Sequence, residues 1–440
     1  MENEINADSN NESEVGINCG KTNDNDKIYG LLGEKLVHSF SPDIHSLLGN
    51  YKYLLFEKSP DEVEPFLRSG SFSALNVTIP YKKLAMTLCD KLSPEAEAIG
   101  SVNTILRGKD GSLHGYNTDA YGFKYLLRES NIDIAAKKVL ILGSGGTGVM
   151  AAYCLSGMGA GEIITVSRSG ENNYDNIGKH SDADIIVNTT PVGMYPANGV
   201  SPLKLDIFTD LKGVVDLIYN PLKTRLALDA EERGIPACCG LSMLVAQAVR
   251  ASELFTQNRS LSPGSEEEAI IYKIKKVTDL MRKKASNIVI IGMPGCGKTT
   301  AGSYLAEISG RPFADCDAAV TSKAESSIPE IFKEKGEEYF RSLETSCLAE
   351  ICKEQGTIIA TGGGVVERAE NYSLLRQNGV IFYIERAGAK LSKEGRPVSC
   401  AVPEDELRRR RIPIYEKWAD FKVEAETSAE IAKMIWDKFA

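Results

Sequence analysis

The chain has 440 residues, a length typical of two or three domains, and its 42% hydrophobic and 25% charged residues are ordinary for a globular protein. A formal net charge of −9 offers no basic field for nucleic acid, and no run of residues approaches the roughly 18 apolar positions that a membrane helix needs. Ten cysteines without a CxxC pair and only four histidines argue against disulfides and structural zinc, and favour a reducing cytoplasm. We therefore expect small-molecule partners and neither nucleic acid nor membrane, with monomer and homodimer both open.

Residues 1–26 carry Asn, Asp, Glu and Ser without an apolar stretch, which predicts a disordered tail and not a signal peptide. A strand pattern follows at 28–33. Soon after it come Ser39 and Ser41, whose hydroxyls at i and i+2 can face one ligand group. Alone this signal is weak, because the Ser-Pro pair at 41–42 commonly just opens a helix.

A lysine follows the next apolar strand, since the run 74–80 leads into Tyr81-Lys82. Active-site loops collect at strand ends, although a surface lysine is the simpler alternative. Later polar clusters, which contain Asn103 and Asp119, also lie at the ends of apolar strands.

A dinucleotide fingerprint occupies the middle of the chain. The strand 138–142 leads into Gly143-Ser144-Gly145-Gly146-Thr147-Gly148, which fits GxGxxG, and a helix is predicted over 149–158. Strand, glycine turn and helix in this order place a pyrophosphate on the start of the helix. The next strand, 163–166, ends at Ser167-Arg168, where an NAD site usually has an acidic residue. The arginine suits a 2′-phosphate, so the sequence favours NADP.

These stretches together resemble shikimate dehydrogenase over residues 27–284. The resemblance rests on the two serines, on Asn76-Val77-Thr78-Ile79-Pro80-Tyr81-Lys82, on Gly115-Tyr116-Asn117-Thr118-Asp119, and on the later segments 189–194, 218–224 and 240–247. It implies an α/β, two-lobed dehydrogenase that reduces 3-dehydroshikimate to shikimate with NADPH. The implied lobes are a substrate lobe (27–125 and 240–284) and a Rossmann NADP-binding lobe (126–239).

The same resemblance assigns residue roles. Lys82 and Asp119 would be the catalytic pair, which is physically sensible because hydride addition to a ketone builds alkoxide charge that an ammonium can protonate. The implied substrate-binding residues are Ser39, Ser41, Thr78, Asn103, Asp119, Tyr219 and Gln247. The implied NADP-binding residues are Gly143, Ser144, Gly145, Gly146, Thr147, Gly148, Ser167, Arg168, Gly240 and Met243. Ser242 replaces a glycine that is more usual in the family, and a helix N-cap is an alternative role for it.

Two alternatives to this interpretation stay open. A catabolic quinate or shikimate dehydrogenase would use NAD, against which Arg168 speaks. A metabolite sensor built from inactive enzyme domains would be expected to lose its chemical residues, but Lys82 and Asp119 are both present.

A loop is predicted at 258–265, followed by a charged amphipathic helix over 266–284. This helix could end the first half or link it to the second. The break at Ala285-Ser286 favours the former.

A phosphate-binding loop begins the second half. The strand 287–291 runs into Gly292-Met293-Pro294-Gly295-Cys296-Gly297-Lys298-Thr299, which fits GxxxxGK[ST]. Lys298 would reach the outer phosphates of ATP, and Thr299 would hold magnesium. An ordinary glycine turn would not explain a Lys-Thr pair in this place. Cys296 is expected to be a small filler and not a nucleophile.

Beyond this loop, Asp315 and Asp317 are predicted to share one face of a strand, where one carboxylate could serve magnesium and the other a hydroxyl. A capping box at 327–330 opens a helix that Gly336 ends, and a second helix is predicted over 337–355. The strand 357–360 then leads into Thr361-Gly362-Gly363-Gly364, whose glycines permit a ring to approach the backbone closely.

This second half, residues 286–440, resembles shikimate kinase through its DxD, FRxxE, TGGG, Arg396-Pro397 and Arg411-Ile412-Pro413-Ile414-Tyr415 stretches. The resemblance implies a P-loop domain with a parallel sheet that phosphorylates shikimate with ATP and Mg²⁺. The implied ATP-binding residues are Gly292, Gly295, Cys296, Gly297, Lys298, Thr299, Thr300 and Arg396. Shikimate would meet Asp317, Arg341, Gly363 and Arg411, magnesium would meet Thr299 and Asp315, and the catalytic residues would be Asp317 and Arg396 on a mobile lid. The whole chain is thus expected to be a bifunctional, cytoplasmic enzyme.

Overall fold

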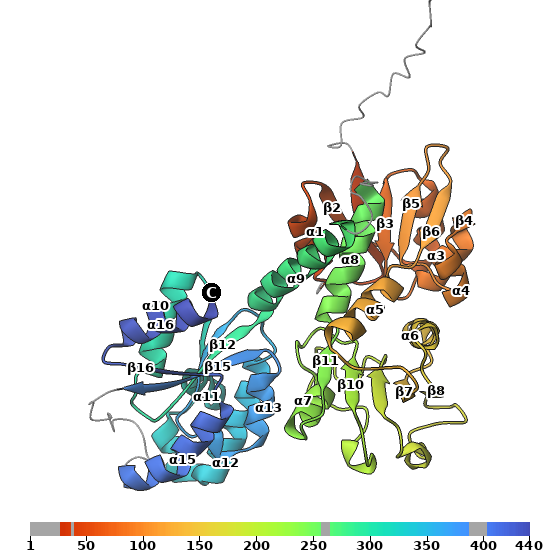
Figure 1. Ribbon diagram of the computed structural model, residues 1–440. Helices are drawn as coiled ribbons and strands as arrows, with labels where there is room; N and C mark the ends of the chain where they lie inside the picture. Colours follow the sequence, from red (N-terminus) through yellow and green to blue (C-terminus); the bar gives the residue numbers. More distant parts are fainter. Residues whose placement is uncertain (1–26, 37–38, 257–264, 387–402) are drawn as a thin grey trace, which may run out of the picture.

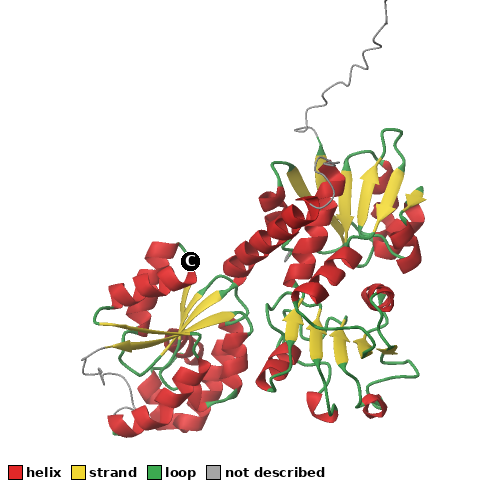
Figure 2. Cartoon of the chain, in the orientation of Figure 1, coloured by secondary structure: helices red, strands yellow, loops and turns green. Residues whose placement is uncertain are grey.

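The computed structural model describes residues 27–36, 39–256, 265–386 and 403–440. The predicted tail 1–26, most of the predicted loop 258–265, and Arg396 with its lid lie outside the described residues. The described chain forms three sheets flanked by helices (Figure 1), and the helices lie on both faces of the second and third sheets (Figure 2).

The first sheet is mixed, with the strand order β2-β1-β3-β5-β6-β4. Its strands are β1 (Ile28–Gly33), β2 (Lys52–Glu57), β3 (Ala74–Val77), β4 (Lys91–Leu92), β5 (Thr104–Arg107) and β6 (Leu113–Tyr116). The helices between them are α1 (Ser41–Leu48), α2 (Pro60–Arg68), α3 (Lys82–Leu88) and α4 (Pro94–Ile99). Because β5 runs antiparallel to both β3 and β6, the carboxyl ends of β3 and β6 lie at the same edge of this sheet.

The second sheet is wholly parallel, with the order β11-β10-β9-β7-β8. Its strands are β7 (Lys138–Leu142), β8 (Glu162–Val166), β9 (Ile185–Asn188), β10 (Gly213–Asp216) and β11 (Ala237–Cys239). Its helices are α6 (Gly146–Gly157), η2 (Ile177–His180), η3 (Leu205–Ile207) and α7 (Arg225–Glu232). The chain passes from β8 to β9 across β7, so the topology reverses beside the carboxyl end of β7, where open α/β sheets bind ligands.

Two long helices join these two sheets. The helix α5 (Asp119–Glu129) leaves the first sheet, and its apolar residues pack with β7 and α6 in the core of the second. The helix α8 (Leu241–Thr256) returns to the first sheet and packs with α1 and α9 (Ser265–Ala285). The amphipathic helix predicted over 266–284 is therefore confirmed, and its apolar side lies in the N-terminal half. Figure 1 shows α9 running from the first sheet toward the third.

The third sheet is also parallel, with the order β13-β14-β12-β15-β16. Its strands are β12 (Asn287–Ile291), β13 (Phe313–Asp315), β14 (Ile358–Ala360), β15 (Gly379–Arg386) and β16 (Phe421–Ala425). Its helices are α10 (Lys298–Ser309), α11 (Cys316–Ala324), α12 (Ile328–Ile351), η4 (Val365–Glu367), α13 (Glu370–Arg376), α15 (Glu404–Trp418) and α16 (Ser428–Phe439). The predicted α/β class with a parallel-sheet P-loop domain is confirmed.

One prediction about this sheet is wrong. Asp315 ends β13, and its side chain accepts a hydrogen bond from the backbone N–H of Ala318 at 3.0 Å, so it caps α11. Asp317 therefore lies in the first turn of a helix and does not share a strand face with Asp315. Helix capping by aspartate outweighs extension of the strand at this point.

The predicted end of one helix and start of another at Gly336 is confirmed, since the range of α12 contains two helices that meet at a kink there. Gly336 has φ +81°, which L side chains rarely adopt, and the capping box between Ser327 and Glu330 is present at the start. Among the described residues, no helix combines the length and the apolar character needed to cross a membrane.

Candidate active sites

A lysine and an aspartate meet at the carboxyl edge of the first sheet. Lys82 is the first residue of α3, after β3, and Asp119 is the first residue of α5, after β6. The distance between Lys82 Nζ and Asp119 Oδ2 is 2.6 Å, and the side chains remain 26% and 17% exposed. The pair is thus preformed yet open to a ligand, which is what a proton-transfer site requires.

Behind this pair lies a buried amide and hydroxyl network. Asn103 Oδ1 accepts a hydrogen bond from the backbone N–H of Thr118 at 2.7 Å, and its Nδ2 donates to Thr118 Oγ1 at 3.0 Å. Gln247 Oε1, from α8, lies 3.4 Å from Thr118 Oγ1 and 3.5 Å from Asn103 Nδ2. Gly122 allows α5 and α8 to approach each other closely, because a Cβ there would lie 2.5 Å from the carbonyl oxygen of Met243. The structure therefore brings Asn103 and Gln247 together beside Asp119.

The two serines lie on a different element from the network. The backbone N–H of Ser41 donates to Ser39 Oγ at 3.2 Å at the start of α1, so Ser39 already has a local role. Between them, the Phe40 ring lies 5.3 Å from the ring of Tyr219, which follows β10. This contact places the serine segment beside the loop that carries Tyr219. Thr78 lies just beyond β3, where its N–H donates to the carbonyl of Leu32 at 2.9 Å.

Sequence reasoning missed several polar groups near α1. Asn76 Oδ1 accepts from the hydroxyl of Tyr53 at 2.8 Å, and the His45 ring stacks on the Tyr53 ring at 3.9 Å. Burial lowers the pKa of His45 to about 3, so its imidazole is neutral near pH 7 and serves as a packing group. Thr118 was also missed as a site residue, although its position directly before Asp119 was an available signal.

The glycine turn predicted to bind NADP lies between β7 and α6. Gly145 is the residue before α6, Ser144 and Gly145 are exposed, and Thr147 lies in the first turn of the helix. Gly143 has φ +110°, and a Cβ on Gly148 would clash with the carbonyl oxygen of Gly143. The loop is therefore tight and leaves its backbone N–H groups available at the start of α6. The helix begins at Gly146, earlier than the predicted 149, because the glycines themselves adopt helical geometry.

Ser167 and Arg168 follow β8, the strand next to β7, so they lie at the same edge as the glycine turn. Arg168 is exposed. At the other side of the turn, Thr189 Oγ1 donates to the carbonyl of Leu142 at 2.8 Å, a contact that sequence reasoning missed. The exposed guanidinium and the tight glycine turn together fit a dinucleotide with a 2′-phosphate.

The start of α8 borders this edge. Gly240 donates through its N–H to the carbonyl of Ile218 at 2.8 Å, and a Cβ on it would clash with the carbonyl of Leu217. Met243 is buried in the core of the second sheet. Ser242 lies inside the first turn of α8, which begins at Leu241, so the alternative that Ser242 is the helix N-cap is wrong.

A buried carboxyl group that no sequence pattern indicated ends β10. Asp216 accepts hydrogen bonds from Asn188 Nδ2 at 3.0 Å, from the N–H of Ile218 at 3.1 Å and from Thr224 Oγ1 at 2.7 Å. Burial raises its pKa to about 6, although these three donors act in the opposite direction. Asp216 thereby fixes both ends of the loop that contains Tyr219.

The phosphate loop of the third sheet joins β12 to α10. Gly295 and Gly297 have φ +83° and +95°, and Lys298 is the first residue of α10. The ammonium of the buried Lys298 donates to the carbonyls of Gly292 at 2.9 Å and Met293 at 3.0 Å. The lysine therefore spans the loop from inside, where it can face an anion held by the backbone N–H groups. Cys296, within this loop, is buried, and Thr300 is exposed on α10.

The two predicted magnesium residues are in direct contact, since Thr299 Oγ1 donates to Asp315 Oδ2 at 2.6 Å. Among the described residues there is no cluster of three or more His, Cys, Asp or Glu side chains that could hold a metal by itself. Two oxygen donors fit Mg²⁺, which usually keeps several waters and binds through one or two protein oxygens plus substrate phosphates.

Two buried arginines lie across the glycines that follow β14. Arg341 donates through Nη1 to Glu344 Oε2 at 2.8 Å, and Arg411 donates through Nε to Glu367 Oε1 at 2.7 Å. A Cβ on Gly364 would clash with the Arg341 guanidinium. Gly364 is therefore required for Arg341 to lie against the backbone.

Asp317 and Pro294 lie close to the same run of glycines. A Cβ on Gly362 would lie 2.8 Å from Asp317 Oδ1, and Gly363 packs on Pro294 of the phosphate loop. The Tyr415 hydroxyl donates to the carbonyl of Gly363. The structure thus brings Asp317, Arg341, Gly363 and Arg411 together, next to the phosphate loop.

The carboxylate partners of the arginines carry opposite pKa shifts. Burial raises the pKa of Glu344, and the ion pair with Arg341 only partly offsets it. Burial also opposes ionisation of Glu367, but Arg411 and Arg410 outweigh it and lower its pKa. No motif or spacing in the sequence indicated a role for Glu367.

Comparisons with known proteins give separate matches for the N-terminal and the C-terminal half of the chain. The family model described as "Shikimate dehydrogenase substrate binding domain" matches residues 31–105, and the model described as "Shikimate kinase" matches residues 294–440. A shikimate dehydrogenase (NADP(+)) of Clostridium beijerinckii is 37% identical over 253 residues, which cover 52% of this chain and 92% of that protein.

Solved structures match the same half. A chorismate mutase/shikimate 5-dehydrogenase fusion protein from Clostridium acetobutylicum is 33% identical with a TM-score of 0.53, covering 58% of this chain and 97% of the other. Shikimate 5-dehydrogenase from Thermus thermophilus, solved with NADP(H) and shikimate, is 28% identical with a TM-score of 0.50, covering 57% and 99%. The chain therefore belongs to the shikimate dehydrogenase family through its N-terminal half and carries a shikimate kinase domain at its C-terminal end, which makes it a bifunctional enzyme of the shikimate pathway.

Proposed function

We propose that Lys82 and Asp119 are the catalytic pair of an NADPH-dependent reduction of 3-dehydroshikimate to shikimate. The observation that carries this proposal is the 2.6 Å contact between Lys82 Nζ and Asp119 Oδ2 at the edge of the first sheet. Bound NADPH supplies the hydride. Lys82 donates a proton to the ketone oxygen as its charge develops, and Asp119 orients the ammonium and accepts a hydrogen bond from a hydroxyl of the substrate.

The substrate's remaining groups are assigned to the surrounding polar residues. Asn103 and Gln247 belong to one buried network, so their amides are held in fixed orientations beside Asp119. Preorganised donors and acceptors lose little freedom when a ligand binds. Together with Thr78 they would meet the ring hydroxyls, while Ser39 and Ser41 with Tyr219 would hold the carboxylate side.

For the cofactor, we assign the pyrophosphate to the glycine turn at the start of α6 and the 2′-phosphate to Ser167 and Arg168. The exposed arginine at the end of β8 supports NADP. Steady-state rates with NADPH and NADH at equal concentration test this assignment. A clear preference for NADH would instead favour the quinate-type dehydrogenase.

The second reaction is the phosphorylation of shikimate. MgATP supplies the phosphoryl group. Lys298 and the loop N–H groups would hold the outer phosphates, and Thr299 with Asp315 would hold the metal ion. Asp317 would orient the attacking hydroxyl and accept its proton, with Arg341 and Arg411 on the substrate carboxylate. Arg396 is proposed to close the site from its lid.

We also propose that residues 27–284 and 286–440 are the two enzyme domains, with substrate and Rossmann lobes at 27–125 with 240–284 and at 126–239. The boundary between residues 125 and 126 falls inside α5 (Asp119–Glu129). A cytoplasmic location is supported by the cysteines, since all eight in the described residues are free thiols.

One coupled experiment tests both chemistries. Purified full-length protein is given 3-dehydroshikimate, NADPH and MgATP, and the loss of NADPH absorbance is followed together with the product mass. Shikimate 3-phosphate that forms only when both cofactors are present supports the proposal. NADPH consumption that stops at shikimate would remove the kinase assignment, and no consumption at all would remove the dehydrogenase assignment.

A further inference from the structure

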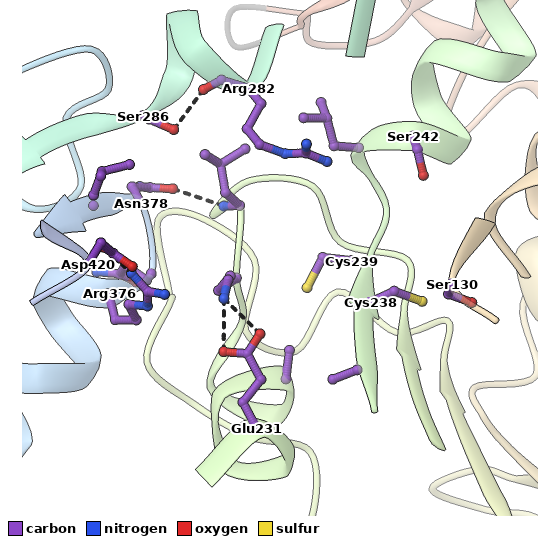
Figure 3. Close-up of a pocket in the computed structure, with 18 of the residues that line it drawn as sticks. Ser130, Glu231, Cys238, Cys239, Ser242, Arg282, Ser286, Arg376, Asn378 and Asp420 are labelled. Atoms are coloured by element: carbon purple, nitrogen blue, oxygen red, sulfur yellow. Dashed lines mark hydrogen bonds and ion pairs between the residues drawn. The ribbon is translucent and has the colours of Figure 1, made fainter. Parts of the chain in front are cut away.

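The kinase half makes direct hydrogen bonds with the loop that carries Tyr219 in the dehydrogenase half. Asn378 Oδ1 accepts from the backbone N–H of Leu222 at 2.9 Å (Figure 3), and the carbonyl of Gln377 accepts from the N–H of Lys223 at 2.8 Å. Gln377 and Asn378 form the turn between α13 and β15, and they are only 3% and 4% exposed. Water is thus largely excluded from these hydrogen bonds, so a donor or acceptor that loses its partner here costs free energy.

Two side-chain pairs extend the same contact. Gln355 Nε2 donates to Asn220 Oδ1 at 2.9 Å, and Asn198 Nδ2 donates to Gln377 Oε1 at 2.6 Å. The kinase residues therefore bond to the loop at positions 220, 222 and 223, between the two positions, 218 and 224, that Asp216 holds.

Leu222, whose N–H binds the kinase half, also packs in the same apolar cluster as Tyr219, a predicted substrate-binding residue. The Leu222 side chain lies in one apolar cluster with Tyr219 and Phe40. Phe40 itself lies between Ser39 and Ser41 in the sequence. A shift of the Leu222 backbone would therefore be transmitted to Tyr219 and to the serine segment, because packed side chains do not deform independently.

A cavity of about 610 Å³ lies next to this contact, lined by both halves. Four of its charged side chains form two ion pairs, Lys223 with Glu231 and Arg376 with Asp420 (Figure 3), and Glu129 and Arg282 line it with opposite charges. The cavity thus offers little unbalanced charge to a ligand, and the hydrogen bonds at its wall are its more informative feature.

We infer that Asn378, with Gln355, is a positioning residue for the dehydrogenase reaction: the kinase half holds the loop 218–224 so that Tyr219 stands at the 3-dehydroshikimate site. The inference rests on the proposed substrate contact of Tyr219. The dehydrogenase of this chain is then completed by its kinase half, and its substrate affinity depends on residues that belong to the other enzyme.

The test uses two single variants of the full chain, Asn378→Ala and Gln355→Ala. Loss of one buried hydrogen bond to the loop should raise KM for 3-dehydroshikimate roughly fivefold. KM for NADPH should change less, because the glycine turn and Arg168, which are assigned to the pyrophosphate and the 2′-phosphate, lie on other elements. Asn371→Ala is the matched control: it removes a buried amide from α13 whose Nδ2 donates to the carbonyl of Val365 within the kinase half. It should leave the dehydrogenase KM values unaltered.

A double-mutant cycle separates positioning from general loosening. If Asn378 acts through Tyr219, then Asn378→Ala should change KM for 3-dehydroshikimate much less in a Tyr219→Phe background than in the native chain. Equal effects in both backgrounds would overturn the inference, as would an unchanged KM in both kinase-side variants or the same change in Asn371→Ala. These results are distinct from failure of the proposed function, in which the native chain itself would not reduce 3-dehydroshikimate.

Discussion

Replacing Asp216 with Asn should remove a pH-dependent loss of stability in the dehydrogenase half. Burial raises the pKa of this carboxyl from 3.8 to about 6, so between these values the folded chain holds a proton that the unfolded chain has released. Stability therefore falls as pH rises through this window. The difference between these two pKa values corresponds to about 3 kcal/mol, of which about 1.4 kcal/mol falls between pH 5 and pH 8. The uncharged amide keeps an oxygen acceptor for Ile218 and Asn188 and escapes this loss.

Urea unfolding at pH 5 and pH 8, followed for native chain and variant, measures the effect. From pH 5 to pH 8, the free energy of unfolding of the variant should rise by about 1.4 kcal/mol relative to that of the native chain. The m-values should not change. Asp210→Asn, which alters an exposed carboxylate of the same lobe, is the control and should show no such gain. A difference that stays constant with pH, or grows toward pH 5, would show that the three donors to Asp216 outweigh burial and that its carboxylate is stabilised in the fold.

Three further predictions concern the two sites. Lys82→Met should lower the dehydrogenase kcat by roughly 10²- to 10⁴-fold. NADPH binding measured by fluorescence should stay intact, and a kcat within twofold of the native value would contradict the role. Asp315→Asn should raise the Mg²⁺ concentration needed for half-maximal kinase activity about tenfold by weakening the site shared with Thr299; an unchanged Mg²⁺ titration would place the metal elsewhere. Glu367→Gln should free Arg411 for the substrate carboxylate and lower KM for shikimate about threefold, whereas a raised KM would mean that Glu367 is needed to orient the arginine.

Local patterns in the sequence predicted the parts of the fold that local physics determines. The glycine turns after β7 and β12 follow from strands that end in residues able to adopt positive φ, and these loops appear where expected. Asp315 shows the limit of such reasoning. Its alternation with Asp317 suggested a strand, but its side chain stabilises the start of α11 more than it stabilises an extended chain.

The contacts that sequence reasoning missed are those between distant segments. Thr118 and Gln247 are 129 positions apart, and Asn378 and Leu222 are 156 apart, yet each pair is hydrogen-bonded. No periodicity or motif marks such partners, because the packing of whole helices and sheets decides which side chains meet. The roles of the site residues themselves remain predictions.

The course of α5 has a practical consequence for building chimeras of this enzyme. The helix starts at Asp119 in one lobe, yet Phe123, Leu126 and Leu127 are buried in the core of the other. A transplanted nucleotide lobe that is cut at residue 126 would split this helix and expose half of its apolar side. A cut before Thr118 would keep the helix whole, but would take the acidic partner of Lys82 along with the new lobe. Exchange of cofactor preference by lobe grafting is therefore inseparable from exchange of part of the chemistry, and single substitutions at Arg168 are the cleaner route.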